Sequence, residues 1–232
     1  MKQISKEVVK KAFTATIPVM TGYLVLAIGF GILLKTKGYG LLWAIAMSGF
    51  IYAGSMQYLT IDLLCGGASL VATAMTTLMV NARHLFYGIS MVERYKGTGK
   101  KKPYLIFALT DETYSLLCSD ESVKGIEEPK EYYFFVSLFN QIYWVAGSII
   151  GSLLGNIIPF NVEGIDFALT ALFVTIFVEQ WLSTKEHFPA LTGLFVSAMS
   201  LETRGADKFL IPSMVMIVVM LLIFRNKKED KT

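Results

Sequence analysis

Residues that hold metals or form disulfide bonds are scarce in this sequence. Among its 232 residues there are two cysteines, Cys65 and Cys118, and two histidines. The cysteines stand apart, without the spacing of a metal site or of a dense disulfide framework, so we expect both to be buried and reduced. A lone histidine beside an arginine is no metal-ligand cluster either. The sequence therefore predicts neither a metal nor a cofactor.

Charged residues are also few, at 17% of the chain, and they cluster between long apolar blocks. Hydrophobic residues make up 54% and aromatic residues 13%. The net charge of +3 comes without a basic patch or aromatic motif for nucleic acid, and we attribute it to cytoplasmic loops that meet anionic membrane lipid. This composition is typical of a polytopic integral membrane protein.

Eight hydrophobic segments predict the architecture. A helix that crosses the hydrocarbon layer needs about 20 mostly apolar residues. The segments are continuously apolar, whereas barrel strands would alternate in pieces of about ten residues. The prediction is an all-α helical membrane bundle in which some helices are short, broken or re-entrant. The segments are residues 12–34, 41–61, 68–92, 103–119, 132–158, 166–183, 188–201 and 209–224.

The basic residues predict the orientation but leave one conflict. Four lysines in residues 2–11 and four basic residues in 225–231 place both termini in the cytoplasm by the positive-inside rule. No A-x-A cleavage pattern follows the N-terminal lysines, so we interpret that stretch as a short interfacial helix leading into the first span. The most basic internal loop, residues 93–103, would face outward if all three preceding segments crossed the membrane. Either one of those segments is re-entrant, or the charge bias is overridden.

The chain is expected to form a single membrane domain, residues 1–232. An acidic, polar loop at 119–131 separates an N-terminal half, about 1–118, from a C-terminal half, about 132–232. Residues 27–50 and 145–173 each show a glycine-rich span, a glycine turn and an apolar span, which indicates either an internal repeat or the shared composition of membrane helices.

A doubled G-x-x-x-G pattern predicts close helix packing. Gly147, Gly151 and Gly155 fall on one helical face, where small residues let a neighbouring backbone approach. The neighbour is either another helix of this chain or a second subunit.

Ionisable residues at membrane depth are the candidate functional residues. Arg83 and His84 lie inside the third segment, and Asp111 and Glu112 inside the fourth. Each costs roughly 2.5 to 3.5 kcal/mol at the bilayer centre, so they must face protein or water. We expect Arg83 to pair with one carboxylate and the other to carry a proton. A salt bridge that only fixes helix register is the structural alternative, but further polar residues, among them Asn81 and Tyr114, exceed what it needs.

The second segment contains a break signal. Gly54, Ser55 and Gln57 interrupt an apolar helix, and a break there would free backbone groups to line a cavity. A small-residue packing notch is the alternative. Ser55 with His84 as base would make an intramembrane hydrolase, but the sequence lacks the G-x-S-x-G elbow. A channel or an assembly subunit without transport of its own is a third class.

Four blocks resemble one known family. They are FIYAGSMQYL (50–59), LMVNARHLFYG (78–88), LTDETYSLL (109–117) and GIDFALTALF (164–173), which are similar in content and order to those of the AzlC-type branched-chain amino acid permeases. The resemblance implies a cytoplasmic-membrane exporter of leucine, isoleucine, valine and their analogues, not an enzyme. It also implies a small, separately encoded membrane partner of the AzlD type.

A zwitterionic substrate needs partners for both of its charged ends. As a hypothesis, Arg83 or free amides at the broken second helix take the carboxylate, and Asp111 or Glu112 the ammonium. A carboxylate that changes protonation as substrate leaves would couple export to the proton gradient, and His84 is the residue type that titrates near neutral pH.

Overall fold

The computed structural model describes residues 5–81, 83–118, 123–155, 174, 177–178, 181–182, 186–205 and 209–229. These residues are helical or irregular, with no strand among them, in agreement with the predicted all-α fold. The chain divides into two compact units, Met1–Leu169 and Thr170–Thr232. That boundary lies within the expected C-terminal half.

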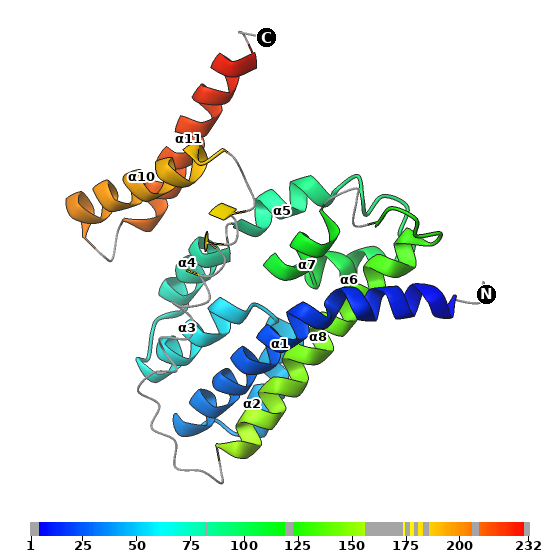
Figure 1. Cartoon of the computed structure of the whole chain (residues 1–232). Helices are drawn as coiled ribbons and strands as arrows, with labels where there is room; N and C mark the ends of the chain where they lie inside the picture. Colours follow the sequence, from blue (N-terminus) through cyan, green and yellow to red (C-terminus); the bar gives the residue numbers. More distant parts are fainter. Residues whose placement is uncertain are drawn as a thin grey trace. The chain divides into compact units, whose positions relative to one another are not determined.

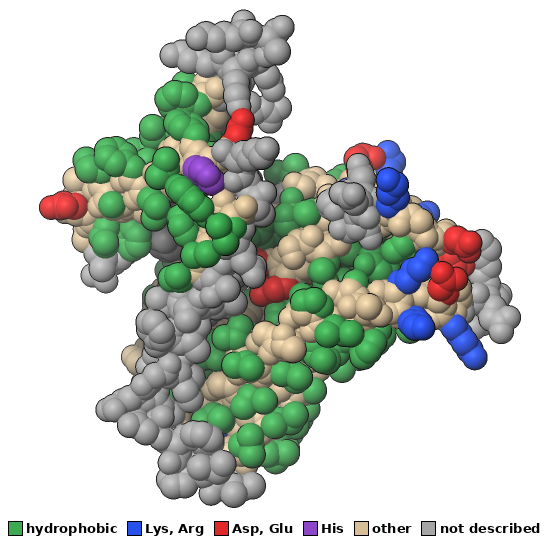
Figure 2. Space-filling model, in the orientation of Figure 1, with side chains coloured by type: hydrophobic (Ala, Val, Ile, Leu, Met, Phe, Trp, Pro, Cys, Tyr) green, Lys and Arg blue, Asp and Glu red, His purple; other side chains and the backbone are tan. Residues whose placement is uncertain are grey.

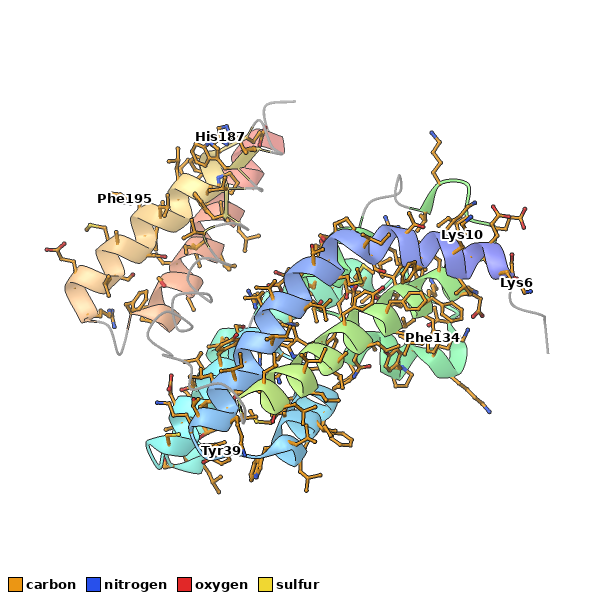
Figure 3. The ribbon with its side chains drawn as sticks, turned by 60° about the horizontal axis from the view of Figure 1, so that its bottom comes forward. Lys6, Lys10, Tyr39, Phe134, His187 and Phe195 are labelled. Atoms are coloured by element: carbon orange, nitrogen blue, oxygen red, sulfur yellow. The ribbon has the colours of Figure 1, made fainter. Side chains whose placement is uncertain are left out.

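Two long parallel helices form the frame of the first unit. They are α1 (Lys6–Thr36) and α8 (Pro129–Leu154), which lie side by side in Figures 1 and 3. Ser5 caps α1 by accepting from the Glu7 amide, and Pro129 begins α8, where its missing N–H costs nothing. Both are long and apolar enough to cross a membrane. The lysine-rich stretch, expected to form a short interfacial helix that leads into the first span, is the first part of α1.

Glycines bring α1 and α8 into backbone contact. A Cβ added to Gly151 would lie 2.1 Å from the Ile28 carbonyl oxygen, and one added to Gly31 would lie 2.3 Å from that of Ser148. A Cβ at Gly155 would meet the Lys35 side chain at 3.0 Å. The G-x-x-x-G face therefore packs within this chain.

The second hydrophobic segment reverses direction halfway, so it is not the single span 41–61 that hydropathy predicted. It contains α2 (Leu41–Ala46), the π-helix η1 (Met47–Ile51) and α3 (Gly54–Cys65). Tyr52 joins η1 to α3 with φ +44°, a left-handed conformation that side chains rarely adopt. We call these elements hairpin A.

Contacts with the frame show where hairpin A turns. Gly54 lies against Trp144, whose ring meets Tyr23 in the middle of α1 at 5.2 Å. Four residues later, the Tyr58 hydroxyl donates to the Leu26 carbonyl (2.7 Å), and its ring packs on Phe30. Hairpin A thus starts at the C-terminal end of α1, turns near mid-height and returns.

The third segment runs the full length of the frame. Its helices are α4 (Leu70–Asn81) and α5 (Arg83–Met91). It starts after hairpin A has returned to the C-terminal end of α1. It ends at Met91, which belongs to a buried cluster with Val8 and Ala12 at the opposite end.

The fourth segment is a second hairpin, entering from the N-terminal end of α1. It contains α6 (Lys102–Phe107) and α7 (Asp111–Leu117), which we call hairpin B. Thr110, at its turn, contacts Tyr23 in the middle of α1, whereas Leu105 before the turn and Leu117 after it both lie in the cluster around Val8. Span 103–119 is therefore also a hairpin and not one continuous helix.

The basic loop at residues 93–103 lies at the end of the first unit where α1 and α8 begin. Tyr95 is buried in the cluster with Val8, and Lys101 forms an ion pair with Glu131 in the first turn of α8. Figure 2 shows charged side chains gathered at this end and hydrophobic side chains along the flank. Because hairpin A turns back, the structure supports the re-entrant alternative that the charge pattern left open.

Both cysteines are free but exposed, which corrects the expectation that they are buried. Cys65 ends α3 and Cys118 follows α7, and residues at helix ends have fewer neighbours to cover them.

In the second unit, the described residues include two helices that pack together, α10 (Phe188–Arg204) and α11 (Leu210–Glu229). The rings of Phe188 and Phe224 meet edge to face at 4.8 Å. Most of the predicted segment 166–183, and the second copy of the internal repeat beyond residue 155, lie outside the described residues. The repeat therefore stays a prediction.

Candidate functional site

Three predicted residues from three helices meet where hairpins A and B turn. The Arg83 guanidinium, in the first turn of α5, lies 2.7 Å from Asp111 Oδ2 through Nη1 and donates to Ser55 Oγ at 3.1 Å through Nη2. Ser55 is buried in the first turn of α3, and the Arg83 and Asp111 side chains are 30% and 16% exposed. The ion pair expected between Arg83 and one of two carboxylates is present.

The second carboxylate has a separate partner. Glu112, the residue after Asp111, accepts a hydrogen bond from the Tyr23 hydroxyl of α1 at 2.6 Å. Tyr23 lies 2.7 Å from the Thr110 hydroxyl, which also caps α7 by accepting from the Thr113 amide. Consecutive positions in the first turn of α7 thus direct one carboxylate to α5 and the other to α1.

Hydrogen-bond acceptors remain unused around the ion pair. Asp111 Oδ1 is buried without a hydrogen-bond partner, and so is Asn81 Oδ1, two residues before Arg83. The first turn of α3 has no side-chain cap, because Ala53 occupies the N-cap position. The amides at an uncapped helix N-terminus attract anions. The site therefore offers acceptors for a cation and donors for an anion.

The other predicted residues lie around this cluster. Gln57 is fully buried and faces α8, accepting from Trp144 Nε1 (2.8 Å) and donating to Ser48 (3.3 Å), and Gly54 also packs on Trp144. Tyr114 stacks on Tyr87 at 4.6 Å. The structure places Gln57 and Gly54 in helix packing beside the ion pair and not in contact with it.

Sequence reasoning missed Tyr23, because a single tyrosine in an apolar span carries no pattern. Thr110 was recognisable as a helix start, since a threonine followed by two acidic residues is typical of an N-cap and first turn. That signal would have located the turn of hairpin B.

The geometry does not bring Ser55 and His84 together as a nucleophile and its base. His84 Nδ1 lies 3.2 Å from the Asn81 carbonyl oxygen, and the Ser55 hydroxyl is bound to Arg83. No hydrogen bond joins Ser55 to His84 among the described residues.

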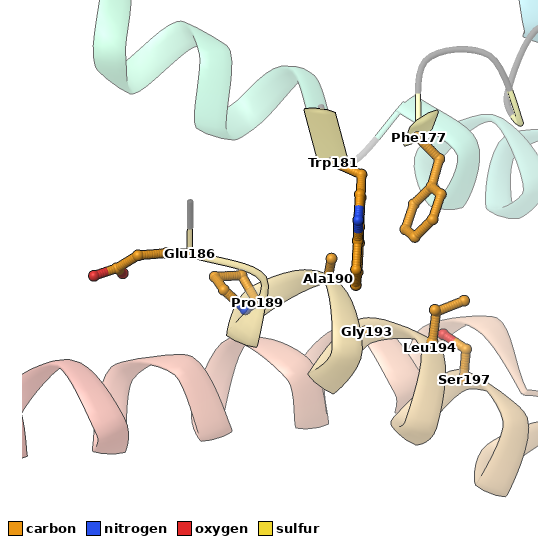
Figure 4. Close-up of a pocket in the computed structure, with 8 residues that line it drawn as sticks. All are labelled: Phe177, Trp181, Glu186, Pro189, Ala190, Gly193, Leu194 and Ser197. Carbon is orange, nitrogen blue, oxygen red and sulfur yellow. The ribbon is translucent and has the colours of Figure 1, made fainter. Parts of the chain in front are cut away.

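A separate cavity of about 520 Å³ lies within the second unit. Figure 4 shows Phe177 and Trp181 pointing toward α10 across it. His187 stacks on Trp181 at 4.0 Å. None of the predicted site residues lines this cavity, so it is not part of the candidate site.

Comparison with known proteins identifies the family. The AzlC protein family matches residues 18–158, which include α1 from residue 18 onward, both hairpins and α8. The chain belongs to the AzlC family. The match includes Ser55, Arg83, Asp111 and Glu112, so the cluster lies in the part of the chain that AzlC proteins share.

AzlC relatives match almost the whole chain. A protein of Bacillus subtilis named branched-chain amino acid transport protein AzlC is 44% identical over 95% of this chain and 86% of its own length. Uncharacterized membrane proteins of Helicobacter pylori and Haemophilus influenzae are each 40% identical, over 95% and 97% of this chain and 96% and 92% of their own lengths. No solved structure matches. With α1 and α8 long enough to span, this AzlC family member is a membrane protein.

Proposed function

We propose that this chain exports branched-chain amino acids across the cytoplasmic membrane, coupled to protons and together with a small AzlD-type partner. The name of the Bacillus subtilis relative supports the substrate class. The observation that carries the proposal is the Ser55–Arg83–Asp111 cluster at the two hairpin turns. Such a polar site at mid-height between discontinuous helices is typical of transporters.

The proposed substrate site matches a zwitterion. The substrate carboxylate lies at the uncapped first turn of α3 and takes hydrogen bonds from Arg83, which has a rigid fork of donors. The ammonium donates to Asp111 Oδ1, which is buried and has no hydrogen-bond partner. Apolar side chains at the hairpin turns, where the rings of Tyr52 and Phe107 are 6.2 Å apart, contact the branched chain.

Glu112 is the proposed proton carrier. It is separate from the ion pair, and the Tyr23 hydroxyl holds it at 2.6 Å. A carboxylate that loses its proton on one side of the membrane and regains it on the other couples substrate movement to the gradient. Direction of transport is set by that gradient, and export is the proposed direction.

The test is efflux of labelled leucine from preloaded cells that lack their own exporters and express this chain with its small partner. Arg83→Gln with Asp111→Asn removes both charges together, which leaves no unpaired ion, so the fold should survive. The proposal expects efflux to fall at least about tenfold, because hydrogen bonds to charged groups contribute roughly 1.5 to 3 kcal/mol. The matched control, Lys101→Gln with Glu131→Gln, removes an ion pair outside the site and should keep efflux.

Efflux retained by the Arg83/Asp111 double variant at equal membrane levels would reduce this pair to a structural link between helices. Wild-type efflux no faster than that of cells without the chain would instead favour a channel or assembly subunit.

A further inference from the structure

A groove lies between α1 and α8 near the N-terminal ends of both helices. Its volume is about 570 Å³. Figure 3 shows Lys6 and Lys10 on the first turns of α1, close to the first turns of α8. The residues that line it are Lys6, Val9, Lys10, Phe13, Phe135 and Phe139.

The two lysines of this groove carry unneutralised charge. Lys6 and Lys10 are four residues apart on one helix, so they lie on the same face. Both are exposed, and neither forms an ion pair within the part of the chain that the structure describes. Lys11 differs, because it pairs with Glu7 at 2.9 Å and donates to the Gly125 carbonyl at 3.2 Å. The groove thus presents two amines to an anion.

The rest of the groove is aromatic. Phe13 meets Phe139 edge to face at 5.6 Å, and Phe139 meets Phe135 at 6.1 Å. Phe13 lies on a candidate membrane-spanning helix and is 44% exposed, so it is accessible from outside the protein. This apolar wall continues directly from the lysines, because Phe13 follows Lys10 by three residues and shares its face.

We propose that this groove binds an anionic phospholipid, with the phosphate on Lys6 and Lys10 and an acyl chain along the phenylalanines. Basic groups beside apolar helix surface at one end of a membrane bundle match the two halves of such a lipid. The groove lies at the end where the basic loop gathers, and that end faces the anionic cytoplasmic leaflet if the positive-inside rule holds. The proposal requires only that α1 and α8 lie in a membrane, and so does not rest on the transport function.

Native mass spectrometry of the full chain purified in detergent tests the proposal. The probes are palmitoyl-oleoyl phosphatidylglycerol, which is anionic, and phosphatidylcholine with the same chains. Wild type should bind phosphatidylglycerol more tightly. Lys6→Gln with Lys10→Gln should weaken that binding about 25-fold, since each lysine near an anionic surface contributes about fivefold. Lys11→Gln is the matched control and should leave it unchanged.

Three results would overturn the assignment. The first is equal binding of phosphatidylglycerol by wild type and the Lys6/Lys10 variant. The second is competition by soluble glycerol phosphate, which would mean an anion site without an acyl chain. The third is loss of the phosphatidylglycerol preference when the small membrane partner is co-purified, which would assign the groove to that protein.

Discussion

Arg83 contacts two helices with one side chain, and that geometry decides which substitutions it tolerates. Its two terminal nitrogens reach Asp111 on α7 and Ser55 on α3. A lysine keeps the charge but has a single nitrogen and no planar fork. We therefore expect Arg83→Lys to insert normally yet lower leucine efflux by about tenfold or more. The control Lys101→Arg exchanges one cation for another in the basic loop and should keep wild-type efflux in the same assay. Equal efflux rates for Arg83→Lys and Lys101→Arg would contradict the prediction.

Glu112 is the residue at which pH dependence should arise. Glu112→Gln keeps an oxygen that accepts from Tyr23 but cannot change charge. If Glu112 carries the proton, efflux by this variant becomes independent of pH across the range in which wild-type efflux changes. Leucine efflux measured at a series of external pH values checks this. The control Glu131→Gln should keep the wild-type profile, and a normal profile for Glu112→Gln would leave the coupling residue elsewhere.

At the scale of elements, the contact between α1 and α8 depends on glycine. Gly151→Val would place a branched side chain against the Ile28 carbonyl, where even a Cβ has only 2.1 Å. The helices must separate, and overpacking of this kind costs typically about 1 to 3 kcal/mol or more. We expect a lower thermal unfolding midpoint for the purified protein. Gly22→Ala in α1 is the control. Apart from the chain neighbours and the backbone of its own helix, no atom lies within 4 Å of the added Cβ, so its midpoint should stay the same or rise slightly.

The sequence predicted which segments are helical, but it did not predict where the chain reverses direction within a segment. Spans 12–34 and 132–158 correspond to α1 and α8. A long apolar segment in lipid must satisfy its own backbone hydrogen bonds, and a helix does this. Spans 41–61 and 103–119 each proved to be hairpins. Hydropathy averages over a window and cannot distinguish one crossing from two half-length helices. The Gly54–Ser55 signal marked the break in the first, but not that the chain reverses at Tyr52.

The sequence predicted which types of residue form the candidate site, but it did not predict which side chains contact one another. Burial cost required Arg83 to face protein or water, the nearby acids made a carboxylate the expected partner, and the structure supplies Asp111. Which of two adjacent acids would pair depended on the turn of hairpin B, which sets their directions. Tyr23 came from a helix with no polar pattern, so only tertiary packing could bring it to Glu112.

At the scale of the whole first unit, the two hairpins enter from opposite ends and meet near mid-height. Among its described residues, three segments run its full length: α1, the α4–α5 segment and α8. This arrangement brings the N-terminal lysines and the basic loop at 93–103 to the same end, so a single orientation satisfies the positive-inside rule for both. Eight complete spans would have placed that loop on the other side. The opposed turns also bring Ser55 and Asp111 close enough together for one arginine to reach both.

The two native cysteines test this arrangement directly. Cys65 and Cys118 are both free and exposed, at opposite ends of the first unit: Cys65 ends hairpin A, and the Cys118 carbonyl accepts from Arg94 of the basic loop at 2.8 Å. With the N-terminus in the cytoplasm, a membrane-impermeant maleimide should label Cys118 only in inside-out vesicles and Cys65 only in right-side-out vesicles. The single-cysteine variants Cys65→Ser and Cys118→Ser separate the two signals, and a permeant maleimide applied to both confirms that each thiol reacts. If both hairpins crossed the membrane as single spans, Cys65 and Cys118 would both lie on the cytoplasmic side, and both would label in the same vesicles.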